Sequence, residues 1–180
     1  MNTLQTGEGF AIWVTGLPAS GKSSVASIIE KRLYEWYTIK AVRLESDVLR
    51  KVLTPEPAYS QGERDWFYEV MIYLGRMLTA NGVNVIFDAT GNKRVYRDKA
   101  KASISRFLEV YIKCPLHICM ERDPKGIYKL AQAGRAHNVP GLQDIYEEPL
   151  SPDIMIASDM TPPDIGADHV IARMKEKGWI

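Results

Sequence analysis

The sequence predicts an α/β protein in which a five-stranded parallel sheet is flanked by helices, giving three layers. Two observations lead to this prediction. Short apolar runs alternate five times with stretches of helical periodicity, which is the pattern of successive strand–helix–strand units. The first apolar run, FAIWVTG at 10–16, is continuous, as expected for a strand that a parallel sheet buries on both faces.

The first helix is expected at 21–36 and the longest helix at 58–82. In the longest helix, Ser60 and Glu63 have the spacing of a capping box, and the Asn81-Gly82 pair is a stop signal. The expected inner face of the first helix consists of Ala26, Ile29, Leu33 and Trp36, and that of the longest helix of Phe67, Val70, Leu74 and Met77.

The other elements follow from the same two patterns. Strands are expected at 41–47, 83–90, 108–114 and 153–158, and helices from near Asp47 and at 93–107, 115–123, 127–134 and 163–180. Residues 134–152 have few apolar anchors and several glycines and prolines, which is typical of a loop over a site. No repeat or linker divides the chain, so residues 1–180 are interpreted as a single domain with a lid region at about 122–150.

Composition excludes several classes of function. The formal net charge is +1, so no bulk field favours nucleic acid or an anionic membrane. Cys114 and Cys119 have no metal-site spacing and are expected to be free thiols of an intracellular protein. The segment at 1–10 has neither a basic region nor a long apolar run, so we expect no signal peptide, no membrane span and a cytoplasmic location.

The stretch GLPASGKSS at 16–24 matches the phosphate-binding pattern G-x-x-x-x-G-K-[ST]. It follows a predicted buried strand and opens a predicted helix, which is the context that this motif requires. The chain is therefore expected to have the P-loop NTPase fold and to bind ATP or GTP with Mg²⁺. The expected phosphate-binding residues are Gly16, Leu17, Pro18, Ala19, Ser20, Gly21, Lys22, Ser23 and Ser24.

Two carboxylates lie near the ends of predicted strands, at the edge where ligands bind in open α/β sheets. Asp47 could act as a base toward an acceptor hydroxyl or organise Mg²⁺, or it could be a plain helix N-cap. Asp88 ends an apolar run in the manner of a Walker B carboxylate that holds Mg²⁺, or it could cap a strand end. The candidate metal-binding residues are Ser23, Asp47 and Asp88.

Four basic residues could contact anionic groups. Arg50 and Arg64 could clamp an anionic acceptor, or each could be a surface arginine. Arg122 and Lys125 belong to a basic run near the expected lid, which could close on phosphates or form a solvated helix face.

The motifs together resemble those of the adenylylsulfate kinases, which phosphorylate the ribose 3′-hydroxyl of adenylyl sulfate with ATP. The resemblance rests on WVTGLPASGKSSVA, LESDVLRKVL, EVYIKCPLHICMERDPKGIYKLAQAG and the later YEEP, and it covers nearly the whole chain. It implies a P-loop nucleotide kinase that commonly forms a dimer and binds ATP with Mg²⁺. It implies that Lys22 and Asp47 are catalytic, that Arg122 and Lys125 cover ATP, and that Arg50 and Arg64 hold the acceptor.

The chain departs from the family pattern in its acceptor half. An aspartate of the family is Glu45 here, an asparagine is Phe67, and a phenylalanine that stacks on the acceptor adenine is Val139. The family's FISP is DATG, which places Asp88 and Thr90 in this region. The expected acceptor-binding residues are Glu45, Arg50, Tyr59, Arg64, Phe67, Asp88, Thr90 and Val139.

Three functions are compatible with these residues. The first is phosphorylation of adenylyl sulfate in sulfate assimilation, or of a close nucleotide analogue. The second is a kinase for another acceptor, such as a cytidylyl phosphoramidate-type nucleotide, a sugar or another small alcohol. The third is a non-catalytic nucleotide-binding partner protein. The expected ligands are ATP, Mg²⁺ and a small nucleotide substrate, in a homodimer with no nucleic acid and no membrane.

Overall fold

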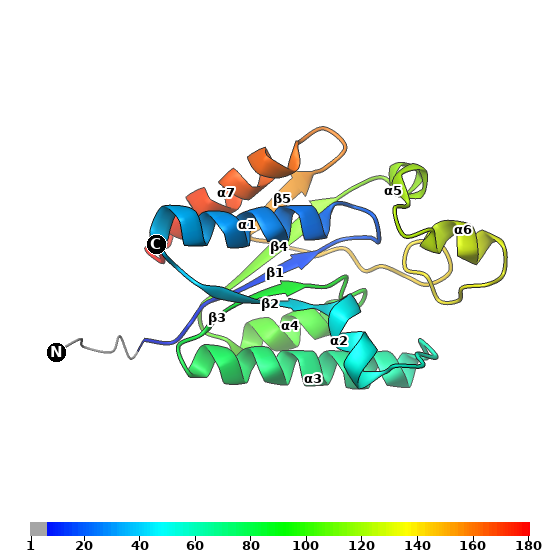
Figure 1. Ribbon diagram of the computed structural model, residues 1–180, viewed down its shortest axis with the longest axis horizontal. Helices are drawn as coiled ribbons and strands as arrows, with labels where there is room; N and C mark the ends of the chain where they lie inside the picture. Colours follow the sequence, from blue (N-terminus) through cyan, green and yellow to red (C-terminus); the bar gives the residue numbers. More distant parts are fainter. Residues whose placement is uncertain (1–6) are drawn as a thin grey trace.

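The computed structural model describes residues 7–180 and contains a five-stranded parallel sheet between two layers of helices (Figure 1). The strand order is β2-β3-β1-β4-β5, and each neighbouring pair runs parallel, as the alternating pattern predicts. The strands are β1 (Ala11–Thr15), β2 (Ala41–Glu45), β3 (Asn84–Asp88), β4 (Phe107–Lys113) and β5 (Ile154–Ala157).

The helices form one layer on each face of the sheet (Figure 1). Helices α1 (Lys22–Tyr37) and α7 (Pro163–Glu176) pack together on one face, and α3 (Gln61–Ala80) and α4 (Arg94–Ser103) on the other. The three shorter helices are α2 (Ser46–Leu53), α5 (Leu116–Arg122) and α6 (Ile127–Gln132). Helix α4 ends earlier than expected, because Ile104 is extended and Phe107 already pairs with Ala11 of β1.

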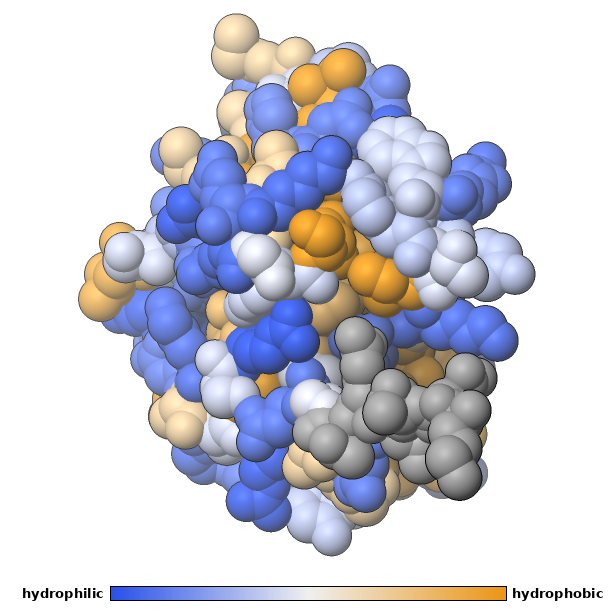
Figure 2. All heavy atoms as spheres, turned by 90° about the vertical axis from the view of Figure 1, so that its left-hand side faces the viewer, coloured by the Kyte–Doolittle hydropathy of each residue, from blue (hydrophilic) through white to orange (hydrophobic). Residues whose placement is uncertain are grey.

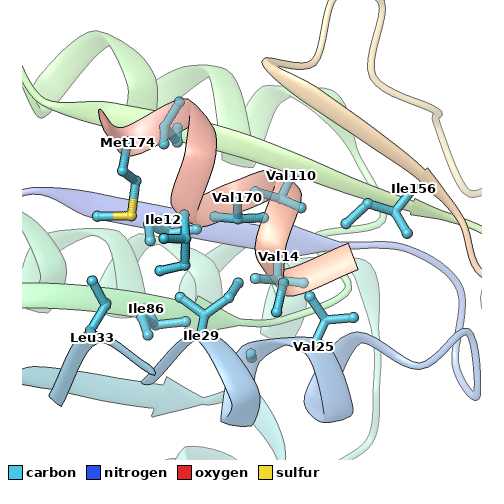
Figure 3. Close-up of a cluster of buried hydrophobic side chains, with 14 of the residues drawn as sticks. Ile12, Val14, Val25, Ile29, Leu33, Ile86, Val110, Ile156, Val170 and Met174 are labelled. Carbon is cyan, nitrogen blue, oxygen red and sulfur yellow. The ribbon is translucent and has the colours of Figure 1, made fainter. Parts of the chain in front are cut away.

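Strand β1 separates two hydrophobic cores, which explains its unbroken apolar sequence. Ile12 and Val14 point into the core under α1 and α7, which Figure 3 shows with side chains from four strands and both helices. Ala11 and Trp13 point into the core under α3 and α4. All five residues of β1 are buried, so the prediction of a strand covered on both faces is confirmed.

The expected inner faces of two helices are partly wrong. Trp36 of α1 is 54% exposed and Met77 of α3 is 43% exposed. Helix α3 faces the sheet with a different side than the sequence predicts, because Gly75 lies directly against the Phe87 ring of β3. This orientation of the helix turns Met77 outward. Val70 and Leu74 are consequently only half-buried. The buried residues of α3 are Arg64, Phe67, Tyr68, Met71, Ile72, Gly75 and Thr79.

Two glycines of α3 should respond oppositely to alanine. A Cβ on Gly75 would lie 2.0 Å from Phe87 Cζ, whereas a Cβ on Gly62 meets nothing within 4 Å. Gly75→Ala should lower the free energy of unfolding by about 1–3 kcal/mol, because overpacking exceeds the roughly 1 kcal/mol gained in helix propensity. Gly62→Ala should raise it by about 0.5–1 kcal/mol. Urea unfolding curves measure both, and effects of the same sign would contradict this packing argument.

Figure 2 shows the end from which the strands start, where small groups of hydrophobic residues lie among hydrophilic ones. Between residues 7 and 180, no helix is long and apolar enough to cross a membrane. Residues 1–6, part of the segment used to argue against a signal peptide, lie outside the described residues. Both cysteines are buried free thiols, as expected.

Candidate active site

The predicted site residues gather where the strands end, at the right-hand side of Figure 1. The loop between β1 and α1 lies there together with α2, α5, α6 and the irregular segment 134–152. Parallel strands place all their carboxyl ends at one edge, so residues distant in sequence converge on this loop.

The phosphate loop, residues 16–23, has the backbone that its glycines predict. Gly16 has φ 151° and Gly21 has φ 96°, values that side-chain-bearing residues rarely adopt. A Cβ on Gly16 would lie only 2.5 Å from the Ile112 carbonyl oxygen. Gly21 caps α1, so the unpaired amides of the first helical turn are available to an anion. The Ser20 hydroxyl is buried and has no hydrogen-bond partner among residues 7–180.

Lys22 lies within this loop and is buried. Its Nζ donates a hydrogen bond to the Leu17 carbonyl oxygen at 2.7 Å. Burial lowers the pKa of Lys22 to about 8, against the opposing attraction of Asp88 and Asp47. A cation that has lost its hydration in this way gains strongly from a phosphate placed beside it.

The pKa of Lys22 predicts a pH dependence of nucleotide binding. A bound triphosphate needs the ammonium form, and the free protein loses that form as the pH rises through about 8. The affinity for a non-hydrolysable ATP analogue should therefore fall by up to about tenfold per pH unit above 8. Calorimetric titrations between pH 7 and 9.5 measure this fall. Lys22→Met should bind weakly with no such slope, and an equal slope in that variant would assign the titration to another group.

Ser23 and Asp88 form a pair at the mouth of the loop. Ser23 Oγ donates to Asp88 Oδ1 at 3.1 Å, and burial raises the pKa of Asp88 despite this hydrogen bond. A hydroxyl and a carboxylate are suitable ligands for Mg²⁺, which prefers oxygen and takes much of its coordination from phosphates and water. Within residues 7–180, no cluster of three or more His, Cys, Asp or Glu side chains could hold a metal ion alone.

Asp47 lies across from Lys22 and is not the helix cap that the alternative interpretation required. Glu45 occupies the N-cap position of α2, and no side chain caps that helix. The Asp47 carboxylate is two-thirds exposed and forms an ion pair with Lys125, which raises the pKa of Lys125. The side chain is therefore accessible from solvent and has a cation beside it.

Arg50 and Arg64 form a second group. The Arg50 guanidinium lies 3.9 Å above the Phe67 ring and 5.2 Å from that of Tyr59, and its Nη1 is 3.3 Å from Glu63 Oε1. The Phe67 ring is fully buried in the core. The ring supports Arg50 from below, and the assignment of Phe67 to the acceptor pocket stays a prediction.

Two other expected acceptor residues serve packing or backbone contacts in this structure. Val139, which belongs to the 134–152 segment, is buried in a small hydrophobic cluster against which Leu17 packs. Thr90 presents its carbonyl oxygen to Thr15 Oγ1 at 2.6 Å. Tyr59 keeps a partly exposed ring, and its carbonyl oxygen accepts from Asn138 Nδ2 at 3.1 Å.

Arg122 and Lys125, the two basic residues expected to cover ATP, contact different parts of the structure. Lys125 pairs with Asp47, as described above. Arg122 donates from Nη2 to the Ser158 carbonyl oxygen at 2.8 Å, and Ser158 Oγ in turn donates to the Ser20 carbonyl oxygen at 2.7 Å. Tyr128 donates to the Pro18 carbonyl oxygen at 3.0 Å. Helices α5 and α6 therefore brace the phosphate loop.

Sequence reasoning missed Arg43, Asn92 and Asp144. Arg43 lies 3.0 Å from Glu45 and 4.0 Å from Asp88. The register of β2 and β3 places these two carboxylates side by side, and Arg43 is the cation between them. The alternation of Arg43 and Glu45 along β2 could have indicated this pairing. No local signal marks Asn92 and Asp144, because their contacts span distant segments.

A parallel sheet of this order, with a glycine-bounded phosphate loop, a buried lysine and a Ser–Asp pair at its mouth, defines a P-loop kinase-type nucleotide-binding protein. The chain belongs to the adenylylsulphate kinase family, whose model matches residues 8–157. This confirms the resemblance inferred from the motifs.

Relatives and solved structures agree with this family. A probable adenylyl-sulfate kinase of Pyrococcus abyssi is 36% identical over 173 residues, covering 96% of this chain and 99% of the relative. An adenylyl-sulfate kinase of Rippkaea orientalis is 33% identical over 174 residues, covering 96% and 95%. The Mycobacterium tuberculosis APS kinase CysC, solved in complex with AMPPNP and APS, has a TM-score of 0.87 and 32% identity, covering 94% and 99%.

Proposed function

We propose that this chain is an ATP-dependent kinase that phosphorylates the ribose 3′-hydroxyl of adenylyl sulfate. The observation that carries the proposal is the arrangement of Lys22, the Ser23–Asp88 pair and Asp47 around the mouth of the phosphate loop. Family membership and the AMPPNP and APS bound to the Mycobacterium tuberculosis relative support it.

The donor half holds ATP. The backbone N–H groups of the phosphate loop, which Pro18 alone lacks, bind the phosphates together with the Ser20 hydroxyl. Lys22 leaves the Leu17 carbonyl to reach the β- and γ-phosphates. Ser23 and Asp88 would hold Mg²⁺, which would supply positive charge beside the transferred group. Their existing hydrogen bond keeps both oxygens in place for this role.

The acceptor half presents the alcohol. Asp47 accepts the proton of the 3′-hydroxyl as that oxygen attacks the γ-phosphorus and the bond to the β-phosphate bridging oxygen breaks. Lys125 forms an ion pair with Asp47, and in this proposal its ammonium also contacts the phosphates of the donor. Arg50, Tyr59 and Arg64 bind the remainder of the acceptor.

A second candidate keeps the kinase reaction and changes the acceptor. Three contacts in the acceptor half favour it. Val139 and Phe67 are buried, and Arg64 already forms an ion pair with a carboxylate, so fewer groups remain to bind adenylyl sulfate. A different nucleotide conjugate or small alcohol would then be phosphorylated by the same donor half. A non-catalytic nucleotide-binding role is less well supported, because Lys22, Asp47, Asp88 and Lys125 are all in place.

The proposal also covers the domain organisation, the assembly and the cellular location of the chain. Residues 1–180 act as one kinase domain with a lid at about 122–150, assembled as a homodimer in the cytoplasm. The pair of free buried thiols is consistent with a reducing compartment.

Coupled ADP release tests the proposed function. The purified chain is supplied with ATP, Mg²⁺ and either adenylyl sulfate or a panel of nucleotides, sugars and polyols. Turnover with adenylyl sulfate at a kcat/KM orders of magnitude above every other acceptor is expected. Absence of turnover at millimolar adenylyl sulfate, with turnover of another acceptor, would replace the first proposal with the second.

A further inference from the structure

Arg64 is committed to partners within the chain. Its side chain is 5% exposed, with Nη1 donating to Asp144 Oδ2 at 2.6 Å and Nη2 donating to the Asn138 carbonyl oxygen. Asn92 Nδ2 donates to the same Asp144 oxygen at 3.2 Å. Asp144 is thus held by α3 and by the segment between β3 and α4, although it belongs to the 134–152 segment.

The pairing changes the charge that an acceptor meets. Arg50 has Glu63 as its carboxylate partner, and Arg64 has Asp144. Each arginine that the family resemblance assigns to the acceptor is therefore already compensated. An anionic group that reaches Arg64 has to replace Asp144, which then loses the buried cation that offsets its own desolvation.

We propose that Asp144 is a specificity-determining residue, whose carboxylate competes with the anionic group of the acceptor for Arg64. The inference rests on the proposed function, because it concerns the acceptor of that same site. Asp144 lines a cavity of about 420 Å³ between Leu17 and residues 141–148, and its side chain is 29% exposed, so a ligand can reach it. The residue disfavours an acceptor with a dianionic group at this place relative to one with less charge.

Anion binding to the donor-saturated protein tests the proposal. Inorganic sulfate is titrated against the chain with its phosphate loop filled by ADP and Mg²⁺, and the shift in melting temperature is recorded. In Asp144→Asn the sulfate concentration for half of the maximal shift should fall about tenfold, because the competing carboxylate is gone. Asp98→Asn removes the same charge from the exposed face of α4 and should behave as the unmodified chain.

Steady-state kinetics supply a second readout. In Asp144→Asn the KM for adenylyl sulfate should fall about tenfold while the KM for ATP stays unchanged. An unaltered sulfate midpoint, or a KM for ATP that changes together with that for the acceptor, would overturn the proposal. The second outcome would assign Asp144 to holding the 134–152 segment in place.

Two controls keep the outcomes separate. If Asp144→Asn does not fold, Asp144→Ser carries the same expectations and retains an acceptor for the Asn92 amide. If the unmodified chain does not turn over adenylyl sulfate, the proposed function fails. The sulfate titration of the variants then still decides whether Asp144 competes for Arg64, because it needs no turnover.

Discussion

Lys22→Ala is expected to lower kcat/KM for phosphoryl transfer by about 10³-fold or more, whichever acceptor is supplied. A preorganised charge at the developing charge of a transferred phosphoryl group is worth roughly 10²–10³ in rate, and Lys22 also contributes to binding ATP. The effect lies in the donor half, so it is the same for adenylyl sulfate and for any other acceptor. Steady-state kinetics with two acceptors measure it.

Lys22→Met separates the charge of Lys22 from its packing. Methionine keeps a long buried stem and removes the ammonium, which burial disfavours in the folded chain. Between pH 8 and 10.5 the unfolded chain holds a proton on Lys22 that the folded chain has lost, so this residue makes stability rise with pH there. Lys22→Met should be as inactive as the alanine variant, at least as stable at pH 7, and without this rise. Activity within tenfold of the unmodified chain would refute the assigned role.

The sequence was sufficient to predict the sheet and the donor half, because both depend on short local patterns. The unbroken apolar run of β1 requires cover on both faces, and the glycines at 16 and 21 permit backbone angles that other residues avoid. Asp88 is the last residue of β3, which pairs with β1, so the register brings it to Ser23. Each step uses residues within one strand, one turn or one crossover.

The acceptor half could not be predicted in the same way, because long-range packing decides it. The rotation of α3 depends on the fit of Gly75 to Phe87, and that rotation buries Phe67 under Arg50. Arg64 meets Asp144 across 80 positions of sequence, and only the path of the 134–152 segment brings them together. The family resemblance predicts that Arg64 is an acceptor ligand, but it says nothing of the carboxylate beside it.

Asp47 is the proposed general base of the acceptor half, and its carboxylate is two-thirds exposed beside Lys125. Asp47→Asn is expected to lower kcat by about 10²–10⁴-fold, the range for loss of a general base, with little change in the KM for ATP. Asparagine has nearly the same shape and lies in the exposed first turn of α2. The stability cost should stay below about 1 kcal/mol, from the lost charge at the helix start.

Glu56→Gln is the matched control for Asp47→Asn, since Glu56 is an exposed carboxylate shortly after α2 and outside the proposed machinery. It should leave kcat within about twofold, as expected of surface substitutions. The pH profile adds a test, because loss of a base flattens the acidic limb of kcat, whereas a displaced helix lowers kcat evenly at all pH values. If Asp47→Asn retains full kcat, the alcohol loses its proton elsewhere, and the other carboxylate at the mouth of the loop, Asp88, becomes the group to replace next.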